Sequence, residues 1–100
     1  MRLQKGKRLE KKVRGSAKVK NKMGLHVRPA TYIAKLLQSC QSKVTLTYKG
    51  ESVNARSIMS IMILTAPKNA KITIEAEGND SEETLSKLLH AFETKFEEDI

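Results

Sequence analysis

The amino-acid sequence predicts an α+β fold of two layers, in which three helices cover one face of a four-stranded antiparallel sheet. Three segments repeat apolar residues at intervals of three and four, which is typical of amphipathic helices, and shorter segments alternate apolar and polar residues, which is typical of half-buried strands. Along the 100 residues their order is β-α-β-β-α-β-α. Elements with a single apolar face bury it by packing as layers, so we expect one domain with its helices on one side of the sheet.

The first half of the chain supplies two strands and a helix. Apolar and polar residues alternate over residues 13–19 and again over residues 43–48, which predicts strands there. A helical repeat runs over residues 27–39, after a loop at residues 21–25. The residues that set these patterns are Val13, Gly15, Ala17 and Val19; Ala30, Ile33, Ala34 and Leu37; and Val44, Leu46 and Tyr48.

A hairpin and a short helix follow. Residues 49–51, Lys-Gly-Glu, predict a tight turn, after which a short strand returns over residues 52–56. Ser57 has the side chain preferred at a helix N-cap, and the apolar residues behind it predict a helix over residues 58–64.

The last strand and helix complete the domain. A turn at residues 67–70 precedes a strand that carries Ile72, Ile74 and Ala76 on one face. Asp80 with Glu83 predicts a capping box at the start of the final helix. The apolar stripe of that helix consists of Leu85, Leu88, Leu89, Phe92 and Phe96.

Charge is distributed unevenly along the chain. Residues 1–22 hold ten Lys or Arg and one Glu, whereas residues 23–100 hold nine Lys or Arg and ten Asp or Glu. The net charge of +8 therefore belongs to the N-terminal part. Residues 1–11 show no periodicity, and we expect a disordered basic extension there, with the domain over residues 12–100. The extension is read either as a contact arm for acidic partners or nucleic acid, or as a solvated tail or a mis-assigned translation start.

Composition also limits the classes of function. No apolar run is long enough for a membrane span, and we expect no signal peptide. The single Cys40 suits a reducing compartment, so we expect a cytoplasmic protein. No cluster of His, Cys, Asp and Glu has the spacing of metal ligands, and we expect no metal and no other cofactor. Residues 23–100 are near-neutral and hold only four aromatic residues, which makes nucleic acid an unexpected partner, although a small basic RNA-binding protein remains a distant alternative.

The main candidate site is the stretch Gly-Leu-His-Val-Arg-Pro-Ala at residues 24–30. His26 directly precedes the predicted helix, whose first N–H groups lack intrahelical acceptors and favour anions, phosphate above all. Histidine is a nucleophile at physiological pH. Arg28 adds a fixed charge and a forked donor for phosphate oxygens. These are the parts of a phosphohistidine site; the alternative is a histidine that caps the helix or lies on the surface.

Three stretches resemble one known family. Residues 24–31, GLHVRPAT, are similar to the active-site motif of the HPr family, the histidine-containing phosphocarriers of the bacterial phosphotransferase system. Residues 53–59, VNARSIM, resemble the regulatory segment of that family, and residues 72–78, ITIEAEG, resemble its last strand and the turn after it. The resemblance covers residues 12–98. The chain departs from the family pattern at Met23, Val27, Ser60 and Asn69, and asparagine at position 69 is compatible with a turn that needs a positive φ.

The resemblance implies an open-faced β-sandwich and a carrier rather than an enzyme. His26 would accept a phosphoryl group on Nδ1 from enzyme I, which phosphoenolpyruvate charges, and pass it to IIA-type domains in sugar uptake, with Arg28 stabilising the phosphate. Ser57 would be phosphorylated by an HPr serine kinase/phosphorylase. A monomer is expected. The residues proposed to dock partners are Val27, Thr31, Ile58, Met59 and Met62.

Two alternatives remain open. Ile58 and Met62 are either docking residues or plain core residues, while Met59 is the member expected to be exposed. The second alternative concerns the branch of the family. The acidic end at residues 96–99 is similar to the nitrogen-branch regulatory paralogue, whereas the segment Ser57-Ile58-Met59 favours the carbon branch.

Overall fold

The computed structural model describes residues 11–97. The part of the extension at residues 1–10, and its expected disorder, lie outside the described residues, whereas Lys11 is the first residue of a strand. The elements in order are β1 (Lys11–Lys18), α2 (Val27–Leu37), β2 (Lys43–Tyr48), β3 (Glu51–Asn54), α3 (Ile58–Ile63), β4 (Lys71–Gly78), α4 (Ser81–Glu93) and the 3-10 turn η1 (Lys95–Glu97).

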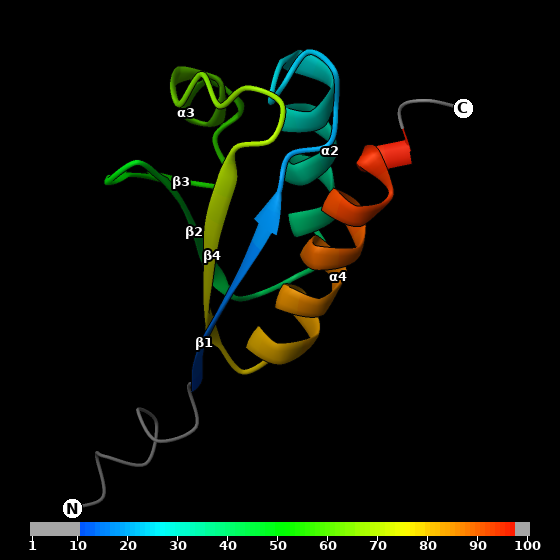
Figure 1. Cartoon of the computed structure of the whole chain (residues 1–100). Helices are drawn as coiled ribbons and strands as arrows, with labels where there is room; N and C mark the ends of the chain where they lie inside the picture. The colour runs from blue at the N-terminus through cyan, green and yellow to red at the C-terminus, as the bar shows by residue number, and fades with distance from the viewer. Residues whose placement is uncertain (1–10, 98–100) are drawn as a thin grey trace, which may run out of the picture.

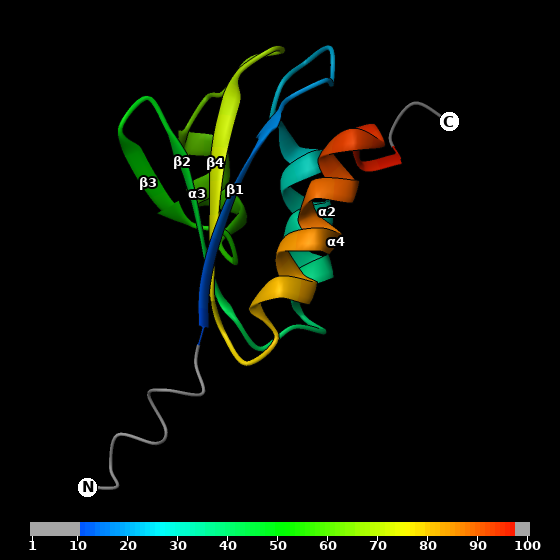
Figure 2. The ribbon, with the colours of Figure 1, turned by 60° about the horizontal axis from the view of Figure 1, so that its bottom comes forward.

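The four strands form one antiparallel sheet in the order β1-β4-β2-β3. Central β4 places Ile74 opposite Gly15 of β1 and Leu46 of β2. Helices α2 and α4 lie across one face of the sheet, and α3 packs against α2 and β3 (Figures 1 and 2). The predicted α+β architecture, an open-faced sandwich, is confirmed.

The core lies between the sheet and the helices. Alternate residues of β4 and β2 point into it, because side chains of a strand point to opposite faces in turn. The largest side chains that are fully buried there are Ile33, Leu37, Leu46, Ile61, Ile72, Ile74, Leu88 and Phe92.

The final helix is shorter than its apolar stripe predicts. It ends at Glu93, so Phe96 does not lie on α4. Residues 95–97 instead turn with φ of 57°, 53° and 54°. This turn carries Phe96 back onto the core, where its ring meets Phe92 edge-on at 4.8 Å and Tyr32 at 5.8 Å between centroids. Phe96 is therefore buried, as the sequence predicts. The predicted continuous helix is wrong, because the contact of Phe96 with Tyr32 across the fold outweighs the helical repeat.

The capping box predicted at Asp80 and Glu83 is wrong. Asp80 is the N-cap residue of α4, but its side chain makes no capping hydrogen bond. The carboxylate instead accepts hydrogen bonds from the backbone N–H groups of Gln41 (2.9 Å) and Ser42 (3.0 Å) and from the Ser42 hydroxyl. Donors brought from the α2–β2 connection therefore replace the local cap.

Arg56 completes a polar junction on the same connection. Its guanidinium donates to the carbonyls of Leu37 (2.7 Å), Cys40 (2.9 Å) and Ser42 (2.8 Å). The last carbonyls of a helix lack intrahelical donors. Arg56 therefore satisfies the C-terminal end of α2 from the segment that leads into α3.

Candidate functional site

His26 is the N-cap residue of α2. Its backbone is extended, with φ −92° and ψ −163°, and its carbonyl accepts the first hydrogen bond of the helix from Ala30 N–H at 3.0 Å. Its side chain makes no capping hydrogen bond, and the residue is half-buried. This geometry excludes the alternative in which the imidazole caps the helix.

The loop that carries His26 is held against the segment after α3. Leu25 N–H donates to the Ala66 carbonyl at 2.9 Å. Gly24 has φ +76°, and a Cβ at that position would lie 2.4 Å from the same carbonyl oxygen. Only glycine meets both demands, a left-handed backbone and this close approach. Gly24 thus sets the path of the chain two residues before His26.

The first turn of α2 presents two backbone donors beside the imidazole. Val27 and Arg28 precede the first hydrogen bond of the helix, and Pro29 has no N–H to offer. No acidic residue lies in this turn. The Arg28 side chain is exposed and lines a shallow groove with Val27, Thr31, Tyr32 and Lys35. The end of α2 can therefore hold an anion with backbone dipoles and a guanidinium.

Ser57 is the N-cap of α3, as the sequence predicts. Its Oγ accepts a hydrogen bond from Ser60 N–H at 3.2 Å, and the residue is half-buried. Helix α3 and the first turn of α2 lie at the same end of the molecule (Figure 1). The capping function of Ser57 is therefore a structural fact, and any regulatory function is additional to it.

Exposed apolar side chains gather on the elements around His26. Met59 is 72% exposed, and Val27 and Ile58 are also exposed, whereas Thr31 is half-buried and Met62 packs partly against the core. Two further members escaped the sequence analysis: Met23, 73% exposed, and Ile63, 65% exposed. The exposed apolar patch consists of Met23, Val27, Ile58, Met59 and Ile63.

A sequence signal for Ile63 existed. The six residues of α3 include five apolar side chains, and a single helix face cannot bury them all. No such signal marks Met23, whose exposure depends on the loop held at Ala66.

Two other classes of site receive no support from residues 11–97. No group of three or more His, Cys, Asp or Glu side chains is placed to hold a metal ion. No helix in that range has the length and apolar character that a membrane span requires.

An open-faced sandwich with a histidine at a helix N-terminus, amid basic and exposed apolar side chains, is the arrangement expected of a phosphocarrier protein. The family model described as "PTS HPr component phosphorylation site" matches residues 13–94. The chain belongs to this family, the HPr family of the phosphotransferase system, whose members are phosphocarriers and not catalytic enzymes.

Individual relatives agree with this assignment. The phosphocarrier protein HPr of Chlamydia trachomatis is 40% identical over 80 residues, which cover 80% of this chain and 73% of that protein. The phosphocarrier protein NPr of Proteus mirabilis is 35% identical over 82 residues, which cover 81% of this chain and 91% of that protein. Among solved structures, HPr of Thermoanaerobacter tengcongensis superposes with a TM-score of 0.82 at 34% identity, covering 88% of this chain and 99% of that one.

Proposed function

We propose that His26 is the phosphoryl acceptor, charged by phosphorylated enzyme I and discharged to IIA-type domains. The observation that carries this is the start of α2, where an imidazole that does not cap the helix lies beside two backbone N–H groups without a hydrogen-bond partner among residues 11–97. The imidazole nitrogen attacks the phosphorus of the donor phosphohistidine, the donor's P–N bond breaks, and a P–N bond to His26 forms. Such a transfer demands positioning and charge stabilisation more than covalent assistance.

Each residue of the site has a distinct role in this proposal. The N–H groups of Val27 and Arg28 bind the oxygens of the phosphoryl group, since these donors point along the helix axis. The Arg28 guanidinium neutralises the remaining charge and presents two parallel donors. Because the same contacts hold the group before and after transfer, His26 can both accept and release it.

The exposed apolar patch is the proposed docking surface for both partners. Exposed methionine is flexible and polarisable, so it adapts to surfaces of different shape. Met59 and Met23 are the most exposed members, which suits a carrier that must meet a donor and several acceptors in turn.

Phosphorylation with a matched histidine control tests the assignment. The protein is incubated with phosphoenolpyruvate and a bacterial enzyme I, and intact mass is followed. We expect the gain of one acid-labile phosphoryl group, its absence in His26→Ala, and its retention in His90→Ala, because His90 is exposed on α4. Acid-labile phosphate at full stoichiometry in His26→Ala would refute the proposal.

Regulation and branch form the second part of the proposal. Phosphorylation of Ser57 by an HPr serine kinase/phosphorylase would add about −1.5 to −2 charges within the docking surface. We assign the chain to the carbon branch on the segment Ser57-Ile58-Met59, with the nitrogen-branch role as the alternative. Discharge of the phosphorylated protein to a sugar-specific IIA domain, in competition with a nitrogen-branch IIA domain, distinguishes the two.

The proposed carrier acts as a monomer in the cytoplasm. A monomer leaves the whole docking surface accessible to its partners. One solved structure of the Thermoanaerobacter tengcongensis HPr is a dimer. Sedimentation of the full chain over a range of concentrations therefore tests this part.

A further inference from the structure

One buried side chain joins the loop before His26 to the end of the fold. Asn21 lies in the connection between β1 and α2 and is 2% exposed. Its side-chain amide donates a hydrogen bond to the Lys95 carbonyl in η1 at 2.9 Å. At the surface, the neighbouring Lys20 forms an ion pair with Glu93 at 2.7 Å. Two segments that lie 74 positions apart in the sequence therefore meet five residues before His26.

Backbone hydrogen bonds continue this attachment from Asn21 to His26. The Asn21 carbonyl accepts from Gly24 N–H at 3.0 Å, and the Gly24 carbonyl accepts from His26 N–H at 3.0 Å. Between them, Leu25 N–H donates to the Ala66 carbonyl at 2.9 Å. The position of the His26 Cβ, from which the imidazole extends, therefore follows the position of Asn21.

The turn η1, which accepts the hydrogen bond, has an unfavourable backbone. Residues 95–97 have φ of 57°, 53° and 54°. Residues other than glycine disfavour this left-handed region, and a run of them persists only where surrounding contacts hold it. Those contacts include the Asn21 amide on the loop and, at 5.8 Å between ring centroids, Tyr32 of α2 against Phe96. The turn is thus held by both elements that flank His26, the loop and α2 (Figure 1).

We propose that Asn21 is a positioning residue for phosphoryl transfer. By binding the η1 carbonyl it holds the loop, and hence His26, where the imidazole nitrogen attacks phosphorus as the donor's P–N bond breaks. This rests on the proposed function of His26 as the phosphoryl acceptor. Transfer needs the reacting atoms aligned at about 3–3.5 Å, so a small displacement of the imidazole lowers the rate steeply. Asn21 is itself buried, so we expect it to act on the rate of transfer and not on the docking of enzyme I.

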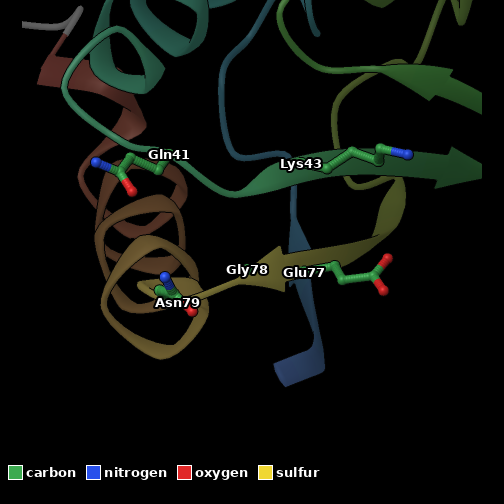
Figure 3. A pocket seen from close by; sticks show the side chains of 5 residues that line it. All are labelled: Gln41, Lys43, Glu77, Gly78 and Asn79. Atoms are coloured by element: carbon green, nitrogen blue, oxygen red, sulfur yellow. The ribbon is translucent and has the colours of Figure 1, made fainter. Parts of the chain in front are cut away.

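A hollow at the other end of the molecule provides a matched control. It has a volume of about 390 Å³ and lies beside the start of α4. The residues that line it are Gln41, Lys43, Glu77, Gly78 and Asn79 (Figure 3). The 13 residues of α4, about 20 Å in length, separate this hollow from η1. Asn79→Ala therefore removes the same side chain as Asn21→Ala, but from an exposed position far from His26.

Single-turnover transfer from phosphorylated enzyme I tests the proposal. The full chain is mixed in excess with enzyme I already charged by phosphoenolpyruvate, and quenched samples give the saturating rate constant and the half-saturating concentration. Temperatures are kept well below the Tm of each variant. We expect Asn21→Ala to lower the rate constant about tenfold or more, with the half-saturating concentration within about twofold of the parent value. Asn79→Ala should change neither quantity.

A second control separates positioning from stability. Asp80→Asn loses hydrogen bonds at the start of α4, so it lowers stability at the end of the molecule away from His26. We expect it to transfer at the parent rate. NMR gives a readout that does not depend on transfer: Asn21→Ala should shift the ring signals of His26, and Asn79→Ala should leave them unchanged.

The outcomes distinguish the role of Asn21 from that of His26. A phosphorylated parent with an unchanged rate constant in Asn21→Ala, or an equal loss in Asp80→Asn, would overturn the proposal for Asn21 alone. A raised half-saturating concentration at the parent rate would indicate docking and also overturn it. Absence of acid-labile phosphate on the parent would overturn the function of His26, and this proposal with it. If Asn21→Ala does not fold, Phe96→Leu loosens the same turn from the α2 side and must show the same loss.

Discussion

Asp80 and Ser42 join the start of α4 to the connection between α2 and β2. The carboxylate accepts hydrogen bonds from the Ser42 hydroxyl and from the backbone N–H groups of Gln41 and Ser42. The Ser42 hydroxyl contributes most to holding the pKa of Asp80 below its ordinary value. The packing of the start of α4 against the distant α2–β2 connection therefore depends on one charged group, the Asp80 carboxylate.

Stability should depend on pH through Asp80. A carboxyl whose pKa is lowered by folding stabilises the protein at pH values above its unfolded pKa, about 4, and this contribution is lost as pH falls through the lower folded pKa. We expect Asp80→Asn to lower the free energy of unfolding by about 1–2 kcal/mol at pH 7. Urea denaturation should show the difference from the parent shrinking towards pH 2.

Glu83→Gln is the control for this pH dependence. Glu83 lies in the same helical turn, but its carboxylate has only Lys87, at 3.6 Å, as an ion-pair partner among residues 11–97. An exposed pair of this kind contributes about 0.5 kcal/mol or less. Equal destabilisation by the two substitutions would contradict the role given to Asp80.

Gly24→Ala should disturb the loop that carries His26. Both Gly24 and Gly50 have positive φ, but a Cβ at position 24 would meet Ala66 O at 2.4 Å, whereas nothing lies within 4 Å of one at position 50. A side chain in the left-handed region costs about 1–2 kcal/mol, and the clash adds to this only at Gly24. We expect slower phosphorylation by enzyme I for Gly24→Ala and the parent rate for Gly50→Ala. Equal rates in the two variants would show that the Ala66 contact does not position His26.

Thr65→Gly should stabilise the protein. Thr65 is β-branched and has φ +47°, a conformation that costs about 1–2 kcal/mol, whereas glycine in an unfolded chain costs about 0.4–1 kcal/mol. We therefore expect the free energy of unfolding to rise by about 0.5–1 kcal/mol, which should be measured as a higher Tm. Thr94→Gly is the matched control, because Thr94 also donates its hydroxyl to a carbonyl but has φ −92°. Thr94→Gly should lower Tm. A fall in Tm for Thr65→Gly as well would disprove backbone strain at Thr65.

Substitutions at Ser57 should separate capping from regulation. Ser57→Ala removes the acceptor for Ser60 N–H and should lower the free energy of unfolding by about 1 kcal/mol, with phosphorylation of His26 intact. Ser57→Asp retains an acceptor but places negative charge in the docking surface, so transfer from enzyme I should slow. Ser86→Asp, exposed on α4, controls for charge alone. Transfer to Ser57→Asp at the parent rate would rule out regulation through this charge.

Local patterns account for what could be predicted of the fold. Periods of two and of three to four residues placed all the strands and helices to within a few residues, since each period depends only on which face of an element is buried. Asn69 was expected to tolerate a positive φ, and it has φ 76°. The predictions that failed, the capping box at Asp80 and the helical position of Phe96, were decided by Ser42 and Tyr32.

The candidate site divides in the same way. His26, Arg28 and the helix that follows them are contiguous, so the sequence by itself determined the family and the candidate phosphoryl site. Tertiary structure alone decided that Gly24 lies against Ala66, that Met23 is exposed, and that Lys18 faces Lys71. Each of these depends on segments about 40 or more residues apart, because pairing of strands and docking of loops bring together charges and surfaces that no local pattern relates.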